Sequence, residues 1–268
     1  HPAVFVACLV WASIAGAREP GVPEGPEKRT EQESAIPQVL TPARLEQPQS
    51  EVPASVTVID RELIEATGAR ELYDVLKLVP GMSAVKVDGN VPTVAYHGTM
   101  ARDVRRMLVL IDGRSVYRPG LARVEWNDLP VSVDDVARIE VTRGPNSAAY
   151  GVNAFSGVIN IITRHSRDVS TTTLETRQGN NGVSDNRLTS GGDEGLFSWR
   201  YTLEQQNDDG YDDGHDPDYR DNDQLYRDAK TLNRANLRAA LDLSPKDQLE
   251  IFAGGSSTEI GRASCRER

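Results

Sequence analysis

The strongest constraint on the fold lies in the last third of the chain, where apolar and polar residues alternate. Apolar side chains occupy every second position over residues 197–203 and again over 235–243. Successive side chains of a β-strand point to opposite faces of its sheet, so this period of two predicts strands with one apolar and one polar face. The chain therefore contains a half-buried sheet in this region.

The connections between these predicted strands alternate in length. Residues 191–195 and 244–247 read as short turns, whereas a long polar loop runs from Gln205 to about Ala229. Short turns on one rim and long loops on the other are typical of a transmembrane β-barrel, and a first strand rising near Ser170 places the long loop outside the cell. About five strands are too few to close a barrel and would leave bare edges. A water-soluble β-sandwich stays open as the alternative.

Residues 51–165 carry the signals of a small α+β domain. Asp60 is an N-cap candidate for a helix over 61–67 that ends at Gly68, and a second helix is predicted over 69–79. Short strands then alternate with tight turns. The Asp-Gly pair between the strands 107–111 and 114–117 indicates a type I′ hairpin turn, which needs positive φ at both central residues.

The most regular segment of this domain is RGPNSAAYGVNAFSGVINIITR, residues 143–164. A short helix over 133–137 and a strand over 138–142 are predicted before it, and an apolar strand over 158–162 lies within it. The segment holds small residues and glycines but no His, Cys or carboxylate. Its pattern therefore indicates close packing rather than chemistry.

The N-terminal 50 residues have a different character. Residues 1–17 read as the apolar core of a secretory signal, because the apolar run is too short to span a membrane and Ala15-Gly16-Ala17 fits a cleavage site. A buried core strand or helix is the alternative. Residues 18–50 are rich in proline and charge without periodicity, so we expect an extended, disordered linker.

Composition excludes several functions. The net charge of −10 over 268 residues argues against nucleic-acid binding. Cys8 and Cys265 cannot form a disulfide framework in a mature chain, and the four His residues lack metal-ligand spacing. No catalytic arrangement stands out, so we expect no enzymatic activity and no cofactor. Residues 260–268 resemble the translation of a sequencing adapter, and we expect this tail to be non-native and the chain to be a fragment.

Five segments in succession resemble the plug domain of TonB-dependent outer-membrane receptors, and the resemblance runs from about residue 40 to 164, with weaker support to about 255. They are TPARLEQPQSEVPASVTVIDRELIE, ELYDVLKLVPGM, MLVLIDGRSVY, VDDVARIEVTRGPNSAAYG and NAFSGVINIITR. The resemblance implies an α+β plug domain of short mixed strands and helices, followed by the first antiparallel strands of a truncated transmembrane β-barrel. We therefore divide the chain into a signal remnant (1–17), a linker (18–50), a plug domain (51–165), barrel strands (166–259) and the tail (260–268).

The same resemblance implies uptake of a scarce nutrient, such as an iron–siderophore or cobalamin, through the outer membrane of a Gram-negative bacterium. The implied partners are TonB with ExbB and ExbD, a small metal-chelate ligand and outer-membrane lipid, and not nucleic acid. A soluble periplasmic or surface binding module with an α+β domain and a β-sandwich is the alternative. A receptor that also signals to a transcription regulator requires an extra folded domain, for which residues 18–50 are too short.

A TonB box, a short strand that pairs with TonB, is implied ahead of the plug. The candidate residues are Ile36, Pro37, Gln38, Val39, Leu40 and Thr41. Backbone hydrogen bonds carry the affinity in such strand addition, and proline cannot donate one. Pro37 and Pro42 face opposite edges, so a paired strand can run between them but not through both. A plain linker is the alternative.

Three further sets of residues are implied by the resemblance. Arg143, with Glu140 nearby, resembles plug positions that form ion pairs with acidic barrel residues and lock the plug to the barrel, although a solvated strand end is the alternative. The ligand-binding candidates in plug loops are Asp88, Asn90, Arg114, Tyr117 and Arg118, with ordinary hairpin residues as the alternative. The acidic loop offers a candidate calcium site, with an ordinary acidic surface loop as the alternative. Its residues are Asp208, Asp209, Asp212, Asp213, Asp216 and Asp218.

Overall fold

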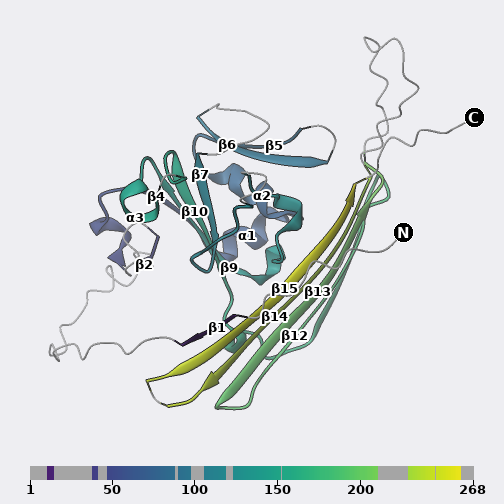
Figure 1. The fold of residues 1–268 in the computed structure, drawn as a ribbon. Coiled ribbons are helices and arrows are strands. Elements are labelled where there is room, and N and C mark those ends of the chain that lie inside the picture. The colour runs from purple at the N-terminus through teal and green to yellow at the C-terminus, as the bar shows by residue number, and fades with distance from the viewer. Residues whose placement is uncertain are drawn as a thin grey trace, which may run out of the picture.

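The computed structural model of the chain describes residues 11–14, 38–41, 47–87, 90–97, 106–118, 123–151, 153–210, 229–244 and 246–260. They form an α+β domain that lies beside a long, tilted antiparallel sheet (Figure 1). Within the described part, no helix is long and apolar enough to cross a membrane.

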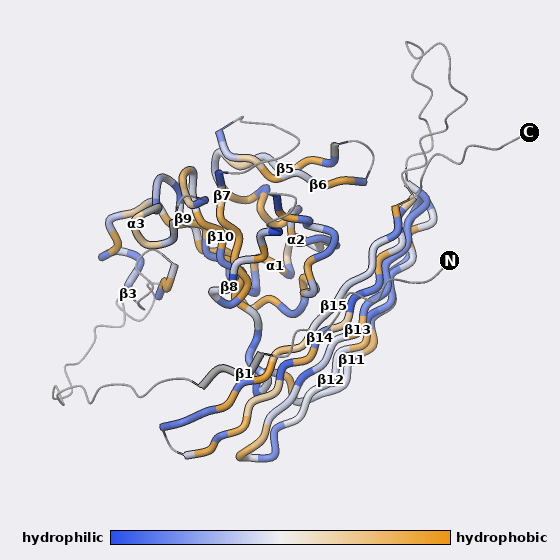
Figure 2. The backbone as a smooth tube through the Cα atoms, in the orientation of Figure 1, coloured by the Kyte–Doolittle hydropathy of each residue, from blue (hydrophilic) through white to orange (hydrophobic). Residues whose placement is uncertain are grey.

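The α+β domain is built on a five-stranded mixed sheet with the order β4-β9-β10-β7-β8. Its strands are β4 (Ser55–Ile59), β7 (Met107–Ile111), β8 (Arg114–Ser115), β9 (Val136–Arg143) and β10 (Gly157–Thr163). The middle strand β10 runs antiparallel to β9 and parallel to β7. Figure 2 shows β7 and β10 as largely hydrophobic, which is the pattern of strands covered on both faces.

The first helix and the tight hairpin form as predicted. Helix α1 (Arg61–Thr67) begins where the Asp60 carboxylate accepts a hydrogen bond from the Leu63 N–H at 2.8 Å. It ends at Gly68, whose φ of 62° is the left-handed conformation that glycine adopts without strain. Positive φ angles of 47° at Asp112 and 75° at Gly113 confirm the turn that joins β7 to β8.

The second helix is shorter than predicted. Only α2 (Leu72–Val75) and the 3₁₀ turn η2 (Leu76–Leu78) form, whereas the sequence indicated a helix over 69–79. Glu71 is extended, with φ −127° and ψ 147°, and its buried carboxylate pairs with Lys230 of the long sheet. The tertiary ion pair therefore overrides local helix propensity at this position.

Several short elements connect the domain. The strands β5 (Met82–Val87) and β6 (Val91–Tyr96) form a separate hairpin, and β2 (Gln38–Val39) pairs with β3 (Gln47–Pro48). The other elements are η1 (Gln49–Glu51), η3 (Trp126–Asp128), η4 (Val133–Asp135), α3 (Ser147–Tyr150) and η5 (Ser166–Asp168). The predicted helix over 133–137 is only η4, because the chain enters β9 at Val136.

One continuous apolar core holds these elements together. Helices α1 and α2 pack over the sheet, and Ile59, Leu76, Val136, Ile139 and Ile159 are all completely buried within this core. Burying side chains of this size supplies the main stabilising free energy of a domain. The described part of the domain therefore has a core of its own, separate from the long sheet.

The long sheet has the order β1-β15-β14-β13-β12-β11, with every neighbouring pair antiparallel. Its main strands are β11 (Thr173–Gln178), β12 (Ser184–Asp193), β13 (Phe197–Asp208), β14 (Lys230–Asp242) and β15 (Gln248–Ile260). The predicted alternation is confirmed, because burial along β13 alternates residue by residue. The described strands do not close into a barrel.

The short strand β1 (Trp11–Ile14) pairs with the Leu249–Phe252 part of β15. These four residues are the described part of the predicted signal segment. The prediction that residues 1–17 form a secretory signal stays a prediction.

Candidate functional site

The candidate site is the contact between the α+β domain and the long sheet, which we call the seam. On the sheet it is formed by alternate residues of β12–β15, and on the domain by residues 70–71, 90, 127–135 and 163–166. The sheet residues that point to the domain are polar: Ser198, Arg200, Thr202, Glu204 and Gln206 of β13 are all buried. Phe197 and Leu203, which alternate with them along β13, are exposed on the opposite face of the sheet. Leu174, Leu237 and Leu241 of other strands are exposed on that same face.

This arrangement of polar and apolar faces is the reverse of that in a water-soluble β-sandwich. In a sandwich two sheets bury their apolar faces against each other. Here the polar face carries the domain, and among the described residues no second sheet covers the apolar face. The sandwich alternative is therefore not favoured.

Asp135 lies at the centre of the seam. Its side chain is 1% exposed and accepts hydrogen bonds from the Arg200 guanidinium at 2.6 Å, from the Thr202 hydroxyl at 2.6 Å and from the Asn236 amide. It also accepts from the Ser132 N–H at 3.0 Å, which closes the capping box of η4. One carboxylate thus joins the domain to two strands of the sheet.

Two more buried carboxylates continue this network. Glu204 of β13 pairs with Arg234 of β14 and accepts a hydrogen bond from the Ser132 hydroxyl at 3.2 Å. Arg234 also donates to the Leu129 carbonyl at 2.8 Å, and Glu71 pairs with Lys230. A buried charge is tolerated when it is paired and hydrogen-bonded, and these charges meet that condition.

The end of the seam beside the long loop is closed by Arg70. Its guanidinium donates to both oxygens of Asp185 at 2.7 Å and lies 3.5 Å from Asp208. The hydrogen bond to Asp185 raises the pKa of Arg70 further above its usual range. The Asn90 amide donates to the same Asp208 at 3.1 Å, so the β5–β6 turn is tied to the last residue of β13.

The opposite end of the seam surrounds an aromatic ring. Arg114 and Arg238 lie 4.5 Å and 4.7 Å from the ring centre of Phe252, near the short-turn end of β15. Arg238 also donates to the Thr163 hydroxyl at 3.0 Å and to the Arg164 carbonyl at 3.2 Å. The segment where the domain passes into the sheet is therefore fixed by Arg238.

Between these two ends the seam is narrow. The Ser256 hydroxyl donates to the Asp128 carbonyl at 2.6 Å, and the Thr258 hydroxyl donates to the Asn127 carbonyl at 3.1 Å. A Cβ atom added at Gly254 would lie 3.1 Å from Cβ of Pro130, which is closer than ordinary contact. The absence of a side chain at Gly254 therefore lets the domain and the sheet approach.

A polar cavity of about 430 Å³ lies on the domain side of the seam, near the long-loop end. Its charged lining residues are Arg70, Glu71, Asp74, Lys77, Lys86 and Lys230. Desolvation and the neighbouring charge of Lys230 lower the pKa of Lys86 below its usual range. The cavity is thus lined by charges of both signs, and most of them are already paired.

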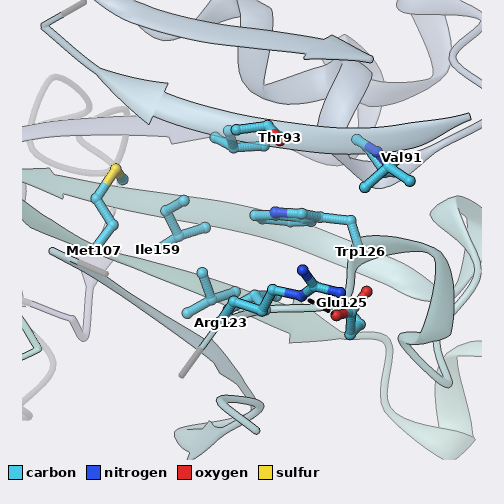
Figure 3. A pocket seen from close by; sticks show the side chains of 11 residues that line it. Val91, Thr93, Met107, Arg123, Glu125, Trp126 and Ile159 are labelled. Atoms are coloured by element: carbon cyan, nitrogen blue, oxygen red, sulfur yellow. Dashed lines mark hydrogen bonds and ion pairs between the residues drawn. The ribbon is translucent and has the colours of Figure 1, made fainter. Parts of the chain in front are cut away.

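Inside the domain, a much smaller cavity of about 30 Å³ lies under β6. Figure 3 shows Trp126 between Val91 and Thr93 on one side and the Arg123–Glu125 ion pair on the other. A space of this size accommodates one or two water molecules and no metal chelate. We therefore place no ligand site there.

The structure places the described part of the TonB-box candidate on the domain. Ile36 and Pro37 lie outside the described residues, whereas Gln38 and Val39 form β2. The backbone N–H groups of Leu40 and Thr41 donate to the Glu140 carboxylate at 2.9 Å and 2.8 Å. The box role itself stays a prediction.

Glu140 and Arg143 were predicted to pair with the barrel. Glu140 is completely buried, and its partners are the linker and Arg138, at 2.9 Å, rather than the described strands of the long sheet. Arg143 lines a groove of about 480 Å³, and its buried Nε has no hydrogen-bond partner among the described residues. Pairing of Arg143 with the barrel stays a prediction.

The four described members of the predicted ligand set do not form one site. Asn90 lies at the long-loop end of the seam, whereas Arg114 stacks on Phe252 near the short-turn end. Arg118 pairs with Asp128 at 2.9 Å, and the Tyr117 N–H donates to the Ser115 hydroxyl at 3.3 Å. Asp88 lies outside the described residues. Asn90 is buried at the long-loop end, and the ligand-binding role of these residues stays a prediction.

The structure describes two of the six calcium candidates. Asp208 turns into the seam toward Asn90 and Arg70, and the Asp209 carboxylate lies against Gly182. The other four candidates, Asp212, Asp213, Asp216 and Asp218, lie outside the described residues. In the part that is described, no group of three or more His, Cys, Asp or Glu side chains is placed to hold a metal.

Sequence reasoning missed the residues that form the seam, such as Asp135, Arg200, Glu204 and Arg234. Their signal is present in the polar positions of the alternating strands, where Arg200, Glu204 and Arg234 lie on one face. Charges at regular positions on a sheet face indicate either a solvated face or a face that needs charged partners.

A domain seated through buried ion pairs on the polar face of a sheet, with the apolar face outward, defines a plug and its wall. Residues 48–158 match the family model described as TonB-dependent Receptor Plug Domain, and this segment is the plug domain of a TonB-dependent receptor. The strands that follow it are the antiparallel strands against which the plug packs.

Two sequence relatives are vitamin B12 transporters named BtuB. The chain is 40% identical over 130 residues to that of Vibrio vulnificus, which covers 48% of this chain and 20% of the relative. It is 30% identical over 187 residues to that of Photobacterium profundum, which covers 69% of this chain and 30% of the relative. The chain thus spans less than a third of either relative.

Solved structures share the fold at lower identity. The ferric yersiniabactin uptake receptor FyuA of Yersinia pestis has a TM-score of 0.61 at 21% identity, covering 84% of this chain and 34% of that one. The ferripyoverdine receptor of the outer membrane of Pseudomonas aeruginosa has a TM-score of 0.60 at 16% identity, covering 85% and 28%. These proteins are receptors, and at this identity they bear on the fold alone.

Proposed function

We propose that this chain supplies the plug and the first wall strands of a TonB-dependent receptor in the outer membrane of a Gram-negative bacterium. The receptor takes up a scarce metal chelate, either cobalamin or an iron–siderophore, and catalyses no chemical reaction. The observation that carries the proposal is the seam, where buried ion pairs seat the plug on the polar face of a sheet whose outward face is apolar. That outward face suits contact with lipid.

The nutrient class is supported by two kinds of relatives. The sequence relatives transport vitamin B12, whereas the structural neighbours named above bind ferric yersiniabactin and ferripyoverdine. Cobalamin is the first candidate to test, because the plug sequence is closer to the B12 transporters than to these two receptors of known structure. TonB, energised by ExbB and ExbD, is the partner that pairs with the linker ahead of the plug.

The test is uptake by a strain that lacks the intact gene. We expect the deletion to abolish uptake of radiolabelled cobalamin or of one ferric siderophore, and we expect a plasmid copy to restore it. The same plasmid should fail in a strain that also lacks TonB. Restored uptake that persists without TonB would contradict the proposed mechanism, and unchanged uptake of every chelate would contradict the proposed class of ligand.

A further inference from the structure

We infer that Glu140 and Tyr150 form a clamp that holds Leu40 and Thr41 on the plug, so that the clamp decides when the linker is free to pair with a strand-adding partner. The docking of the linker on the plug rests on hydrogen bonds and burial, and the identity of the partner rests on the proposed function. The clamp is distinct from the seam, because it joins the plug to its own N-terminal linker.

The carboxylate of Glu140 carries most of the contact. One oxygen accepts from the Leu40 N–H at 2.9 Å, the Thr41 N–H at 2.8 Å and the Thr41 hydroxyl at 2.6 Å. The other oxygen accepts from Arg138 Nε at 2.9 Å. Hydrogen bonds to an ionised carboxylate are roughly twice as strong as bonds between neutral groups. Glu140 is completely buried, so these partners take the place of water.

Two further contacts hold the same linker residues. The Tyr150 hydroxyl donates to the Thr41 carbonyl at 2.7 Å, so both backbone polar groups of Thr41 are bound by the plug. Val39 is completely buried and packs with Val52 and Val56 in a small apolar cluster. Thr41 itself is completely buried. The linker is therefore bound through its N–H groups, a carbonyl and an apolar side chain.

The β2–β3 ladder is too short to dock the linker by itself. The strands β2 and β3 pair over only two residues each, Gln38 with Pro48 and Val39 with Gln47. Isolated two-stranded ladders are marginal even when they are longer. The buried carboxylate is therefore the main anchor. Substituting it should release the linker while the plug core, which lies on other residues, stays folded.

The position of Glu140 determines which part of the plug receives a force that is applied to the linker. Strand β9 lies between β4 and β10 inside the five-stranded sheet. Tension on residues 38–41 therefore acts first on the clamp and, through Glu140, on an interior strand of the plug. A partner that pairs with the backbone ahead of Leu40 must break the clamp before it can extend its own pairing past that residue.

The experiment is hydrogen–deuterium exchange on the intact receptor without ligand, followed at the Leu40 and Thr41 amides. We expect Glu140→Gln to speed exchange of these amides by roughly ten- to a hundredfold, the range for lost hydrogen bonds to a charged group. Thr41→Val and Tyr150→Phe each remove one hydroxyl bond and should give smaller increases. Glu51→Gln, at an exposed carboxylate in η1, is the matched control and should have no effect.

The amides of Ile139 and Val141 report whether the plug is still folded. If Glu140→Gln speeds their exchange too, the plug has unfolded and the two hydroxyl variants decide the question. Unchanged protection of Leu40 and Thr41 in a folded plug overturns the clamp. A second readout is retention of the purified periplasmic domain of TonB on the receptor. Faster exchange without any gain in retention supports the clamp but contradicts the proposed TonB-box role.

Discussion

The core of the plug and the seam are both buried, yet they are built from opposite chemistry. The core is made of aliphatic and aromatic side chains, with Ile59, Leu76 and Ile139 completely inaccessible. The seam buries charges instead, including Asp135, Arg200, Glu204, Arg234 and Lys230. Both regions exclude water, but different contributions to the free energy hold them together.

The difference indicates that the plug is a folded unit and that its attachment to the wall is a separate interaction. Apolar burial is favourable without regard to direction, whereas a buried ion pair is stable only in one geometry and becomes costly when one partner is removed. A plug that separates from the wall returns its charged groups to water. The ion pairs of the seam therefore fix the plug in one defined position on the wall.

Removal of the central seam carboxylate gives the largest expected effect. Asp135→Ala leaves Arg200 buried without its carboxylate partner, which should lower the free energy of unfolding by about 3–5 kcal/mol. The measurement is the thermal and denaturant stability of the intact receptor in detergent. Part of the loss arises inside the plug, because Asp135 also caps η4.

A double variant separates these two contributions. Adding Arg200→Met to Asp135→Ala removes the orphaned charge, so the double variant should lose clearly less stability than the sum of the two single variants. Additive losses would mean that the ion pair between Asp135 and Arg200 contributes nothing to the stability.

Truncating a side chain in the core should lower the stability nearly as much, but it should speed amide exchange in different strands. Leu76→Ala leaves a cavity in the plug core and should lower the stability by about 2–5 kcal/mol. Because the defect lies inside the plug, amide exchange should rise across β9 and β10. Asp135→Ala should instead raise exchange mainly at η4 and along β13 and β14. Identical exchange patterns for both variants would contradict the separation between core and seam.

An exposed ion pair should matter least. Lys77 pairs with Asp74 at 2.6 Å, but its side chain is 55% exposed. Lys77→Ala should change the free energy of unfolding by less than about 0.5 kcal/mol in the same assays. A loss comparable to that of Asp135→Ala would show that charge near the seam, rather than burial, determines the effect.

Local features of the fold were predictable because their signals lie within a few residues. Asp60 and Gly68 delimit α1, and Asp112-Gly113 fixes the turn between β7 and β8. The period-two pattern likewise predicted the two faces of the long sheet. These features depend on backbone conformation and side-chain direction, which neighbouring residues determine.

The contacts of the candidate site were not predictable in this way. Asp135 and Arg200 are 65 residues apart in sequence, and no local pattern pairs them. Glu140 was expected to face the barrel, whereas its described partner Thr41 lies 99 residues away in the linker. A charge between the apolar residues Ile139 and Val141 did indicate that a buried partner must exist, but not which one.

Gly254 shows how closely the plug and the wall approach each other. Its missing side chain lets Pro130 of the plug approach the wall, and a methyl group there would meet the proline at 3.1 Å. Even a small residue would act as a spacer that moves the two surfaces apart by a few tenths of an ångström. The fit of the plug against the wall at this point therefore depends on Gly254 carrying a hydrogen atom where other residues carry a side chain.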